Sequence, residues 1–125
     1  MDKKIMYYMF EHDTCAKIEI CYPGDLIKGP AVLVENYSSE WYKLPFGKRV
    51  GPFSYKDLLK VLENRCFPRT RANCKQLLAE VGLSYYDPLR LVEISHGALV
   101  SDLTWIRFEG EEPELWDTIN PRHIL

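Results

Sequence analysis

Apolar and polar side chains alternate along residues 14–22, and this alternation constrains the fold more than any other feature of the sequence. The side chains of one parity are apolar and those of the other are mostly polar: Ala16, Ile18, Ile20 and Tyr22 against Lys17, Glu19 and Cys21. A period of two is typical of a β-strand with one buried face. Residues 5–11 predict a partner strand, and the short turn at His12 and Asp13 predicts a β-hairpin.

The rest of the chain predicts one more strand, then helices, then a late strand. Ser54, Thr70 and Asp87 each precede a helical segment and are good N-cap residues. Gly82 follows the second of these segments, where a C′ glycine is expected. The predicted elements are strands over 31–36 and 104–108, helices over 55–65, 71–81 and 88–95, and a short helical turn opened by Pro113. The predicted fold class is therefore α+β, with an N-terminal antiparallel β-sheet followed by a three-helix segment and a late β-strand.

A length of 125 residues corresponds to one domain with its own core. We expect a β-rich half over 1–53, a helical half over 54–97, and a strand with an acidic tail over 98–125. The chain is too short for a protein kinase, a complete P-loop enzyme or a (β/α)8 barrel. It contains no apolar run of signal-peptide or membrane-span length, and its four cysteines lack metal or redox spacing, which predicts a cytoplasmic protein with free thiols.

No motif in the sequence argues for catalysis. His96, Ser101 and Asp102 are the residue types of a hydrolase triad, but no G-x-S-x-G turn accompanies them. Ser101 and Asp102 directly before a strand predict a turn. The three histidines are not spaced as metal ligands, and no glycine-rich phosphate loop is present. We therefore predict a protein that is not an enzyme and that uses neither a metal nor a cofactor.

The net charge of −2 hides a dipolar distribution. Nine bases lie between residues 43 and 75 and are opposed only by Asp57 and Glu63, so the local charge is +7. Residues 109–117 carry five acids and no base. This distribution excludes a uniformly basic, histone-like nucleic-acid binder, but it allows a basic patch and an acidic patch on one molecule.

The acidic end and an aromatic connection predict a protein-binding surface, because aromatic side chains flanked by charge are typical of interfaces. Five aromatics in irregular segments are candidates: Tyr37, Trp41, Tyr42, Phe46 and Trp116. The expected partner contacts are Trp41, Tyr42, Glu109, Glu111, Glu112, Glu114, Trp116 and Asp117. The alternatives are a solvated charged face and a long loop that is packed by its own side chains.

The basic middle predicts a second kind of partner. Arg65, Arg69, Arg71 and Lys75 surround the start of the second predicted helix, which is where a helix–turn–helix protein contacts DNA. A DNA-binding regulator that uses residues 66–75 is therefore an alternative function. Against it, the segment between the helices contains a proline and no glycine, and the net charge of the chain is negative.

Motifs in the second half resemble a known family. They are Arg65, Pro68, Arg71, the helix end at 78–82, His96-Gly97, Ser101-Asp102, Trp105-Ile106, Trp116 and Asn120. This pattern resembles the short N-terminal regions, and stand-alone homologues, of HipA-like proteins in Firmicutes. Small proteins of this type also occur on phages and integrative elements. The resemblance covers most of the chain.

In the kinase-like relatives a catalytic domain follows this region, so the resemblance implies a docking or regulatory module and not a kinase. It also implies structural roles, in which Arg65 and Arg71 pair with Asp102 or cap carbonyl groups, and Trp105 and Trp116 close the core. We expect a non-enzymatic protein-interaction module of phage or mobile-element origin that inhibits or regulates a host protein. One example is an anti-CRISPR-type inhibitor of a type II CRISPR nuclease, and a regulatory partner of a HipA-like kinase is an alternative. No membrane partner is expected.

Overall fold

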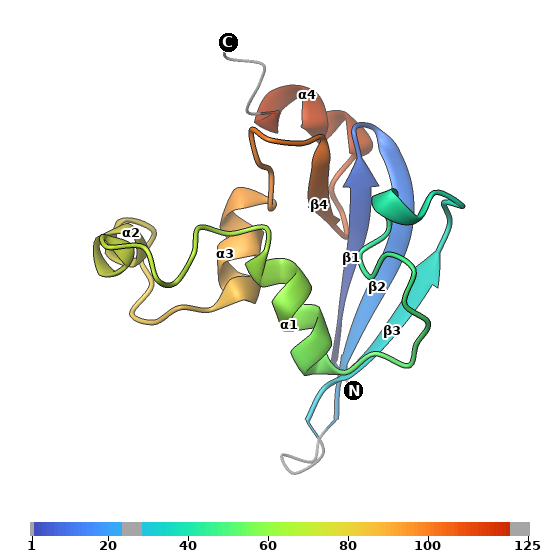
Figure 1. Ribbon diagram of the computed structural model, residues 1–125, viewed down its shortest axis with the longest axis horizontal. Helices are drawn as coiled ribbons and strands as arrows, with labels where there is room; N and C mark the ends of the chain where they lie inside the picture. The colour runs from blue at the N-terminus through green and yellow to red at the C-terminus, as the bar shows by residue number, and fades with distance from the viewer. Residues whose placement is uncertain (1, 24–28, 121–125) are drawn as a thin grey trace.

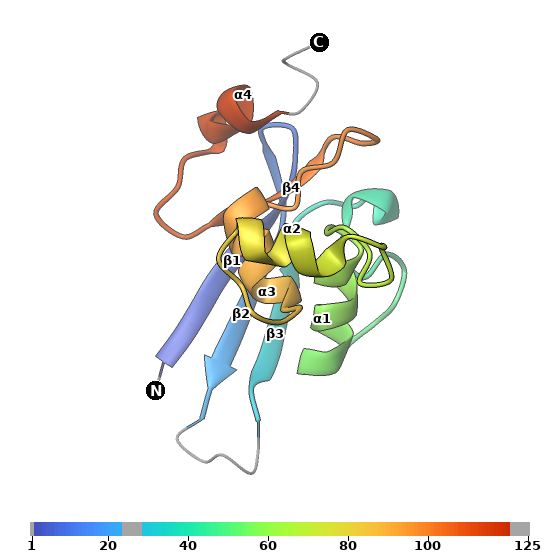
Figure 2. The ribbon, with the colours of Figure 1, turned by 90° about the vertical axis from the view of Figure 1, so that its left-hand side faces the viewer.

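The computed structural model describes residues 2–23 and 29–120. In these ranges four strands form one sheet in the order β3-β2-β1-β4, and all neighbouring strands are antiparallel. The strands are β1 (Asp2–Phe10), β2 (Asp13–Tyr22), β3 (Ala31–Asn36) and β4 (Thr104–Phe108). Helices α1 (Tyr55–Glu63) and α3 (Pro88–Ser95) cover one face of the sheet (Figure 1 and Figure 2). The predicted α+β class, with an N-terminal antiparallel sheet and a late strand, is confirmed.

Four shorter elements complete the described chain. They are the helices α2 (Cys74–Glu80) and α4 (Trp116–Ile119) and the 3-10 helices η1 (Trp41–Lys43) and η2 (Pro113–Leu115). Helix α4 lies near the turn of the β1–β2 hairpin, whereas α2 projects away from the sheet beyond α3 (Figure 1). The helical turn predicted at Pro113 is η2.

The β1–β2 hairpin follows the predicted alternation along most of its length, and the predicted apolar face of β2 is buried against the helices. The pairing skips Cys15, which is the extra residue of a β-bulge opposite Tyr8 and Met9. Both of these β1 side chains are buried, one in each of the two hydrophobic clusters. The turn lies at residues 11–12, one residue earlier than predicted.

The main core lies between the sheet and helices α1 and α3. Its largest fully buried side chains come from both layers: Met6, Ile18, Ile20 and Ile106 from the sheet, Leu58 and Leu62 from α1, and Val92 from α3. Burial of one such side chain stabilises the fold by about 1.5–3 kcal/mol. Phe46 and Phe53 stack with ring centres 3.8 Å apart, and they anchor the connection between β3 and α1 to this core. The prediction that Phe46 lies at an exposed interface is therefore wrong.

A second, smaller hydrophobic cluster contains Met9, Trp105 and Trp116. Trp105 and Ile106 are neighbours on β4 and point to opposite faces, so this cluster lies on the sheet face away from α1 and α3. The Trp105 and Trp116 rings stack with centres 6.0 Å apart, and Trp105 Nε1 donates a hydrogen bond to the Glu11 carbonyl oxygen at 2.6 Å. The structural role that the family resemblance implies for both tryptophans is confirmed by their burial.

Helices α1 and α3 begin at their predicted caps. Ser54 Oγ accepts a hydrogen bond from Asp57 N, and Asp57 Oδ2 accepts one from Ser54 N, both at 3.0 Å. This reciprocal pair is a capping box, which satisfies two backbone donors at the start of α1. Asp87 caps α3, because its Oδ1 accepts a hydrogen bond from Leu89 N at 3.2 Å. Helix α3 has the predicted bounds.

Helix α2 is shorter than predicted. It begins at Cys74 instead of residue 71, and Thr70 is not its cap. Two successive hydrogen-bonded turns occupy residues 68–74 and replace the first predicted helical turn. The helix ends at Glu80, one residue earlier than predicted, but Gly82 is the predicted C′ residue, because it takes a positive φ of 79° and closes a Schellman motif.

Candidate protein-interaction site

Arg65 follows the C-cap of α1 and is buried, with all three guanidinium nitrogens bonded. Nη1 and Nη2 donate to the carboxylate oxygens of Asp102 at 2.7 and 2.8 Å. Nη2 also donates to the Thr104 carbonyl oxygen, and Nε to that of Gly97. A side chain at position 97 would be strained, since Gly97 has a φ of 60° and a Cβ there would lie 3.0 Å from the Arg65 Cβ. The predicted nucleic-acid contact of Arg65 is wrong because its guanidinium is occupied, and the pairing with Asp102 is confirmed.

Two of the three residues that match a hydrolase triad by type, His96 and Asp102, have separate partners. Asp102 is held by Arg65, and His96 Nε2 lies 2.8 Å from Glu111 Oε2. Over residues 2–23 and 29–120, no group of three or more His, Cys, Asp and Glu side chains is arranged to hold a metal ion. His123 lies outside the described residues. In the same ranges no helix is long and apolar enough to cross a membrane.

Residues 109–120, which we call the acidic segment, are bonded to the sheet and do not project from the fold as a free tail. Glu111 Oε1 accepts a hydrogen bond from Phe108 N at 2.8 Å, and its Oε2 contacts His96 at the same distance. Asp117 Oδ1 lies 2.8 Å from His12 Nε2 in the β1–β2 turn. These contacts connect the segment to β4, to the end of α3 and to the hairpin. Glu111 is therefore occupied within the fold.

Trp116 is the buried centre of this segment and is only 3% exposed. The prediction that its side chain contacts a partner is wrong, because it would have to leave the stack with Trp105 to do so. The acidic residues with exposed side chains are Glu109, Glu112, Glu114 and Asp117. The acidic segment therefore exposes carboxylates to solvent, while its tryptophan is buried.

Trp41 and Tyr42 lie on η1, beyond β3, and both are about half exposed. Lys48 Nζ lies 5.0 Å from the centre of the Trp41 ring, and the Tyr42 hydroxyl donates a hydrogen bond to Glu40. Lys43 of η1 lies over the ring of Phe10, which has the same parity on β1 as the core residue Tyr8, so η1 lies on the sheet face that α1 and α3 cover. Trp116 packs on Trp105 on the opposite face. The predicted partner surface is therefore divided between the two faces of the sheet.

The nine bases of the basic middle divide into two groups. Four form ion pairs with acids: Lys43, Arg49, Arg65 and Arg69. The other five have no ion pair with any residue that the structure describes: Lys48, Lys56, Lys60, Arg71 and Lys75. The local charge of +7 overstates the basic surface, because Glu40 and Asp102 lie outside residues 43–75 but neutralise two of its bases.

Helices α1 and α2 do not form a helix–turn–helix. The two helices of that motif pack against each other, whereas α1 packs on α3 and α2 packs extensively on no other described element. Arg69 and Arg71 precede α2, and Arg69 Nε donates to Glu63 Oε1 at 2.7 Å. The predicted helix pair is therefore wrong as a structure, although Arg71 and Lys75 are exposed cations.

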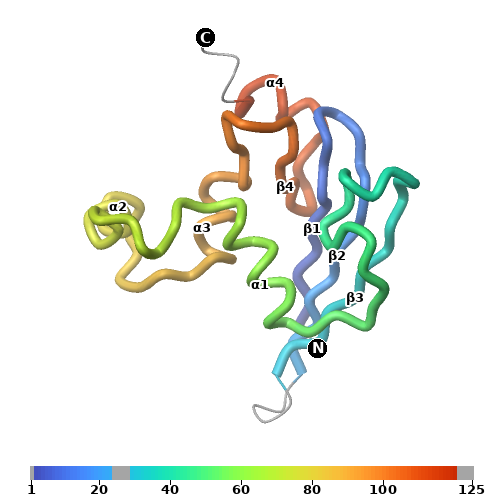
Figure 3. Tube along the Cα trace, viewed as in Figure 1, coloured from blue at the N-terminus to red at the C-terminus, as the bar shows by residue number. Residues whose placement is uncertain are grey.

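Residues 67–86, which include α2, form a lobe that projects from the body of the molecule (Figure 3), and we call it the α2 lobe. Its two ends meet at a neck, where the Tyr86 hydroxyl donates to the Phe67 carbonyl oxygen at 2.6 Å and the two rings contact edge to face. The Arg69 guanidinium lies 4.7 Å from the centre of the Tyr86 ring. Burial raises the pKa of Tyr86 to about 12, so the hydroxyl keeps its proton at neutral pH.

An apolar groove of about 330 Å³ separates the α2 lobe from α3. Leu77 and Val81 line it from the lobe, and Ile94 lines it from α3. Val81 is 39% exposed and Ile94 is 47% exposed. Cys66 is also part of the lining, and burial raises the pKa of its thiol to about 12, so the thiol is neutral. The groove offers apolar contact area and no ionised nucleophile among these residues.

The sequence of the second predicted helix places Cys74, Leu77, Leu78 and Val81 on one face. The predicted helix has an apolar stripe, which is typical of a helix packed on a core. In α2 only Leu78 of that stripe is buried, and Leu77 and Val81 line the groove instead. The apolar pattern is present in the sequence, but its exposure depends on how the lobe is placed relative to α3.

Comparisons with known proteins do not extend this description. No protein-family model, no curated protein and no solved structure matches the chain. The resemblance to the N-terminal regions of HipA-like proteins therefore stays a prediction, and the function has to be inferred from the surfaces of the chain itself.

Proposed function

We propose that this chain is a protein-interaction module, and that its partner fills the groove between the α2 lobe and α3. The observation that carries this proposal is the exposure of Val81 and Ile94 on the two walls of an apolar groove. Exposed apolar side chains that surround a hollow are typical contact points of a protein interface. Covering them removes apolar surface from water, which is worth about 25 cal/mol per Å².

The chemistry of the groove supports binding over catalysis. The Cys66 thiol stays protonated because burial raises its pKa to about 12. The guanidinium of Arg65, which also lines the groove, is bonded to Asp102 and to two carbonyl oxygens. Neither group is available to act on a substrate, whereas the aliphatic side chains are available to be covered.

Peptides selected on the full chain from a random displayed library test this proposal. We expect their affinity to fall at least about tenfold in Val81→Asp and in Ile94→Asp, because a carboxylate buried against apolar atoms costs more than about 1.4 kcal/mol. Leu33→Asp is the matched control, since Leu33 on β3 is also exposed but lies outside the groove. Peptides that bind both groove variants normally, or that lose affinity equally for the control, would contradict the proposal.

Two narrower functions come from the family resemblance and can be tested with the same variants. One is inhibition of a type II CRISPR nuclease, measured as cleavage of target DNA by the guide-loaded enzyme. The other is regulation of a HipA-like kinase, measured as co-purification of the two proteins. If either function uses this groove, Val81→Asp abolishes the effect and Leu33→Asp preserves it.

A further inference from the structure

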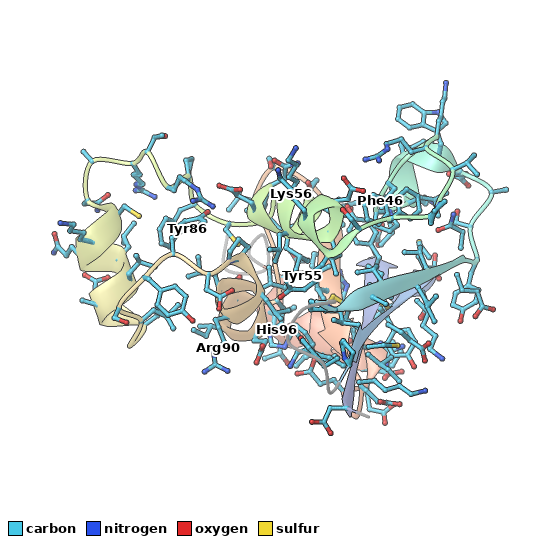
Figure 4. The ribbon with its side chains drawn as sticks, turned by 90° about the horizontal axis from the view of Figure 1, so that it is seen from below. Phe46, Tyr55, Lys56, Tyr86, Arg90 and His96 are labelled. Carbon is cyan, nitrogen blue, oxygen red and sulfur yellow. The ribbon has the colours of Figure 1, made fainter. Side chains whose placement is uncertain are left out.

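A second groove, of about 460 Å³, lies between α1 and residues 85–88, where the chain leaves the neck. One wall carries Lys56 and Lys60, which are exposed on α1. Figure 4 shows both sides of this region, with Lys56 on α1 and Tyr86 in the neck. This groove and the apolar groove beside α3 border the same neck of the α2 lobe.

The carboxylates of this groove already have partners. Glu63 Oε1 accepts a hydrogen bond from Arg69 Nε at 2.7 Å, and Asp87 Oδ1 caps the first turn of α3. Lys56 and Lys60 have no ion pair within the described ranges. They are four residues apart on one helix, so their side chains lie on the same side of it. With Arg69 included, the lining carries three cations against two carboxylates, so its net charge is +1 and its positive charge is concentrated on the lysine wall.

The rest of the lining is mostly apolar. Leu59 and Pro88 line the groove together with Tyr85, a residue that is 64% exposed. A ligand that fits must bring negative charge to the lysines and an apolar group to the surface beside them. A simple anion would leave that apolar surface uncovered.

We infer that this groove binds an acidic, extended segment of a partner protein. Carboxylates of the segment bond to Lys56 and Lys60, and an apolar side chain between them covers Leu59. The inference rests on the proposed function, because a single partner that fills the apolar groove beside α3 would reach this groove across the neck.

The lining favours a protein segment over a nucleic acid. A nucleic-acid backbone carries a phosphate at every nucleotide, and a strand in the groove would bring this charge close to Glu63 and Asp87. An acidic peptide separates its charges with uncharged side chains. It can therefore direct carboxylates only to the lysine wall.

A fluorescent peptide in which glutamates alternate with leucines is the probe, titrated with the full chain and followed by fluorescence anisotropy. We expect the double variant Lys56→Glu, Lys60→Glu to bind it at least about tenfold more weakly, and salt to weaken binding to the unmodified chain. The matched control is Lys48→Glu, Lys75→Glu, which makes the same change of charge at two exposed lysines outside the groove and should bind within about twofold of the unmodified chain. Circular dichroism checks that each variant is folded, and Lys56→Gln, Lys60→Gln repeats the test with a smaller change of charge.

Several outcomes would overturn the inference. Absence of binding to the unmodified chain would do so, as would an equal loss in both double variants, which would indicate attraction by net charge alone. An oligonucleotide that competes more strongly than the peptide would make the ligand a nucleic acid. Self-association of the chain that the peptide displaces would make it a second copy.

Val81→Asp separates this inference from the proposed function. The variant should lose the library-selected peptides and keep its affinity for the acidic peptide, because Val81 lines only the groove beside α3. If Val81→Asp binds the library-selected peptides with unchanged affinity, the proposed function is wrong, but the result for the Lys56 and Lys60 variants is not affected. If acidic-peptide binding is lost in Val81→Asp, the peptide occupies the other groove and the inference fails.

Discussion

The α2 lobe and the segment over residues 109–120 differ in how they are fastened to the body. The acidic segment is held by Glu111, by Asp117 and by the burial of Trp116. The α2 lobe is held at a neck and leaves Val81 exposed beside a groove. The comparison teaches that a dense run of charge does not by itself mark a binding surface. The acidic segment packs on the fold, whereas an apolar side chain of the α2 lobe is exposed.

Trp116→Ala should cause the largest loss of stability, and it tests how tightly the acidic segment is packed. Removing a buried tryptophan leaves a cavity against Trp105, and we expect the free energy of unfolding to fall by about 3–5 kcal/mol in urea titrations. Val81→Ala in the α2 lobe should change it by less than about 0.5 kcal/mol. Similar losses in the two variants would show that the lobe is packed as tightly as the acidic segment.

Glu111→Ala should cause the next largest loss. Its carboxylate accepts from Phe108 N and contacts His96, and removing it leaves a partly buried backbone donor without its acceptor. We expect a loss of about 1–3 kcal/mol in the free energy of unfolding. Glu112→Ala, one residue further along and exposed, is the control and should be neutral within about 0.5 kcal/mol. Equal effects would mean that both acids are surface charges.

Tyr86→Phe tests the neck and has a dependence on pH. Loss of the hydrogen bond to Phe67 should cost about 1 kcal/mol at neutral pH. Because burial raises the pKa of Tyr86 from 10.0 to about 12, its contribution is fully present below pH 10 and is lost as the pH rises from 10 towards 12. The stability of the unmodified protein should therefore fall more steeply than that of the variant over this range. Parallel curves would contradict the assignment.

Asp117→Asn should have the smallest effect. The contact between Asp117 and His12 joins two exposed side chains, and such pairs contribute at most about 1 kcal/mol and often nothing measurable. Thermal unfolding of the variant should therefore be close to that of the unmodified protein. A loss as large as that of Glu111→Ala would show that this contact, and not the buried ones, holds the acidic segment.

Most elements could be predicted because their information is local. The strand β3, the helix α3 and the strand β4 have their predicted bounds, since alternation, a capping Asp87 and the following Pro88 act within a few residues. The start of α2 differs because the turns that begin at Pro68 compete with the predicted helical turn. Local patterns do not contain the bulge at Cys15, which depends on the facing strand.

The site was less predictable than the fold. The sequence suggested that Trp116 and Arg65 contact partners, and each is buried in contacts that a remote segment supplies. The apolar stripe of the second predicted helix is typical of a face packed on a core, but Val81 is exposed because the lobe stands away from α3. In each case the sequence shows the type of residue, but it does not show whether the side chain is exposed.

The sequence by itself determined the succession of strands and helices along the chain, most of their caps and the polarity of their faces, because these depend on neighbours along the chain. Only the tertiary structure decided which charged and aromatic residues are accessible. Arg65 and Asp102 are 37 residues apart, and Trp105 and its acceptor Glu11 are 94 apart. Strand β4 pairs with β1 and brings residues 104–120 back beside the hairpin. That closure hides the acidic segment's tryptophan, and the neck at Tyr86 leaves the α2 lobe outside the core.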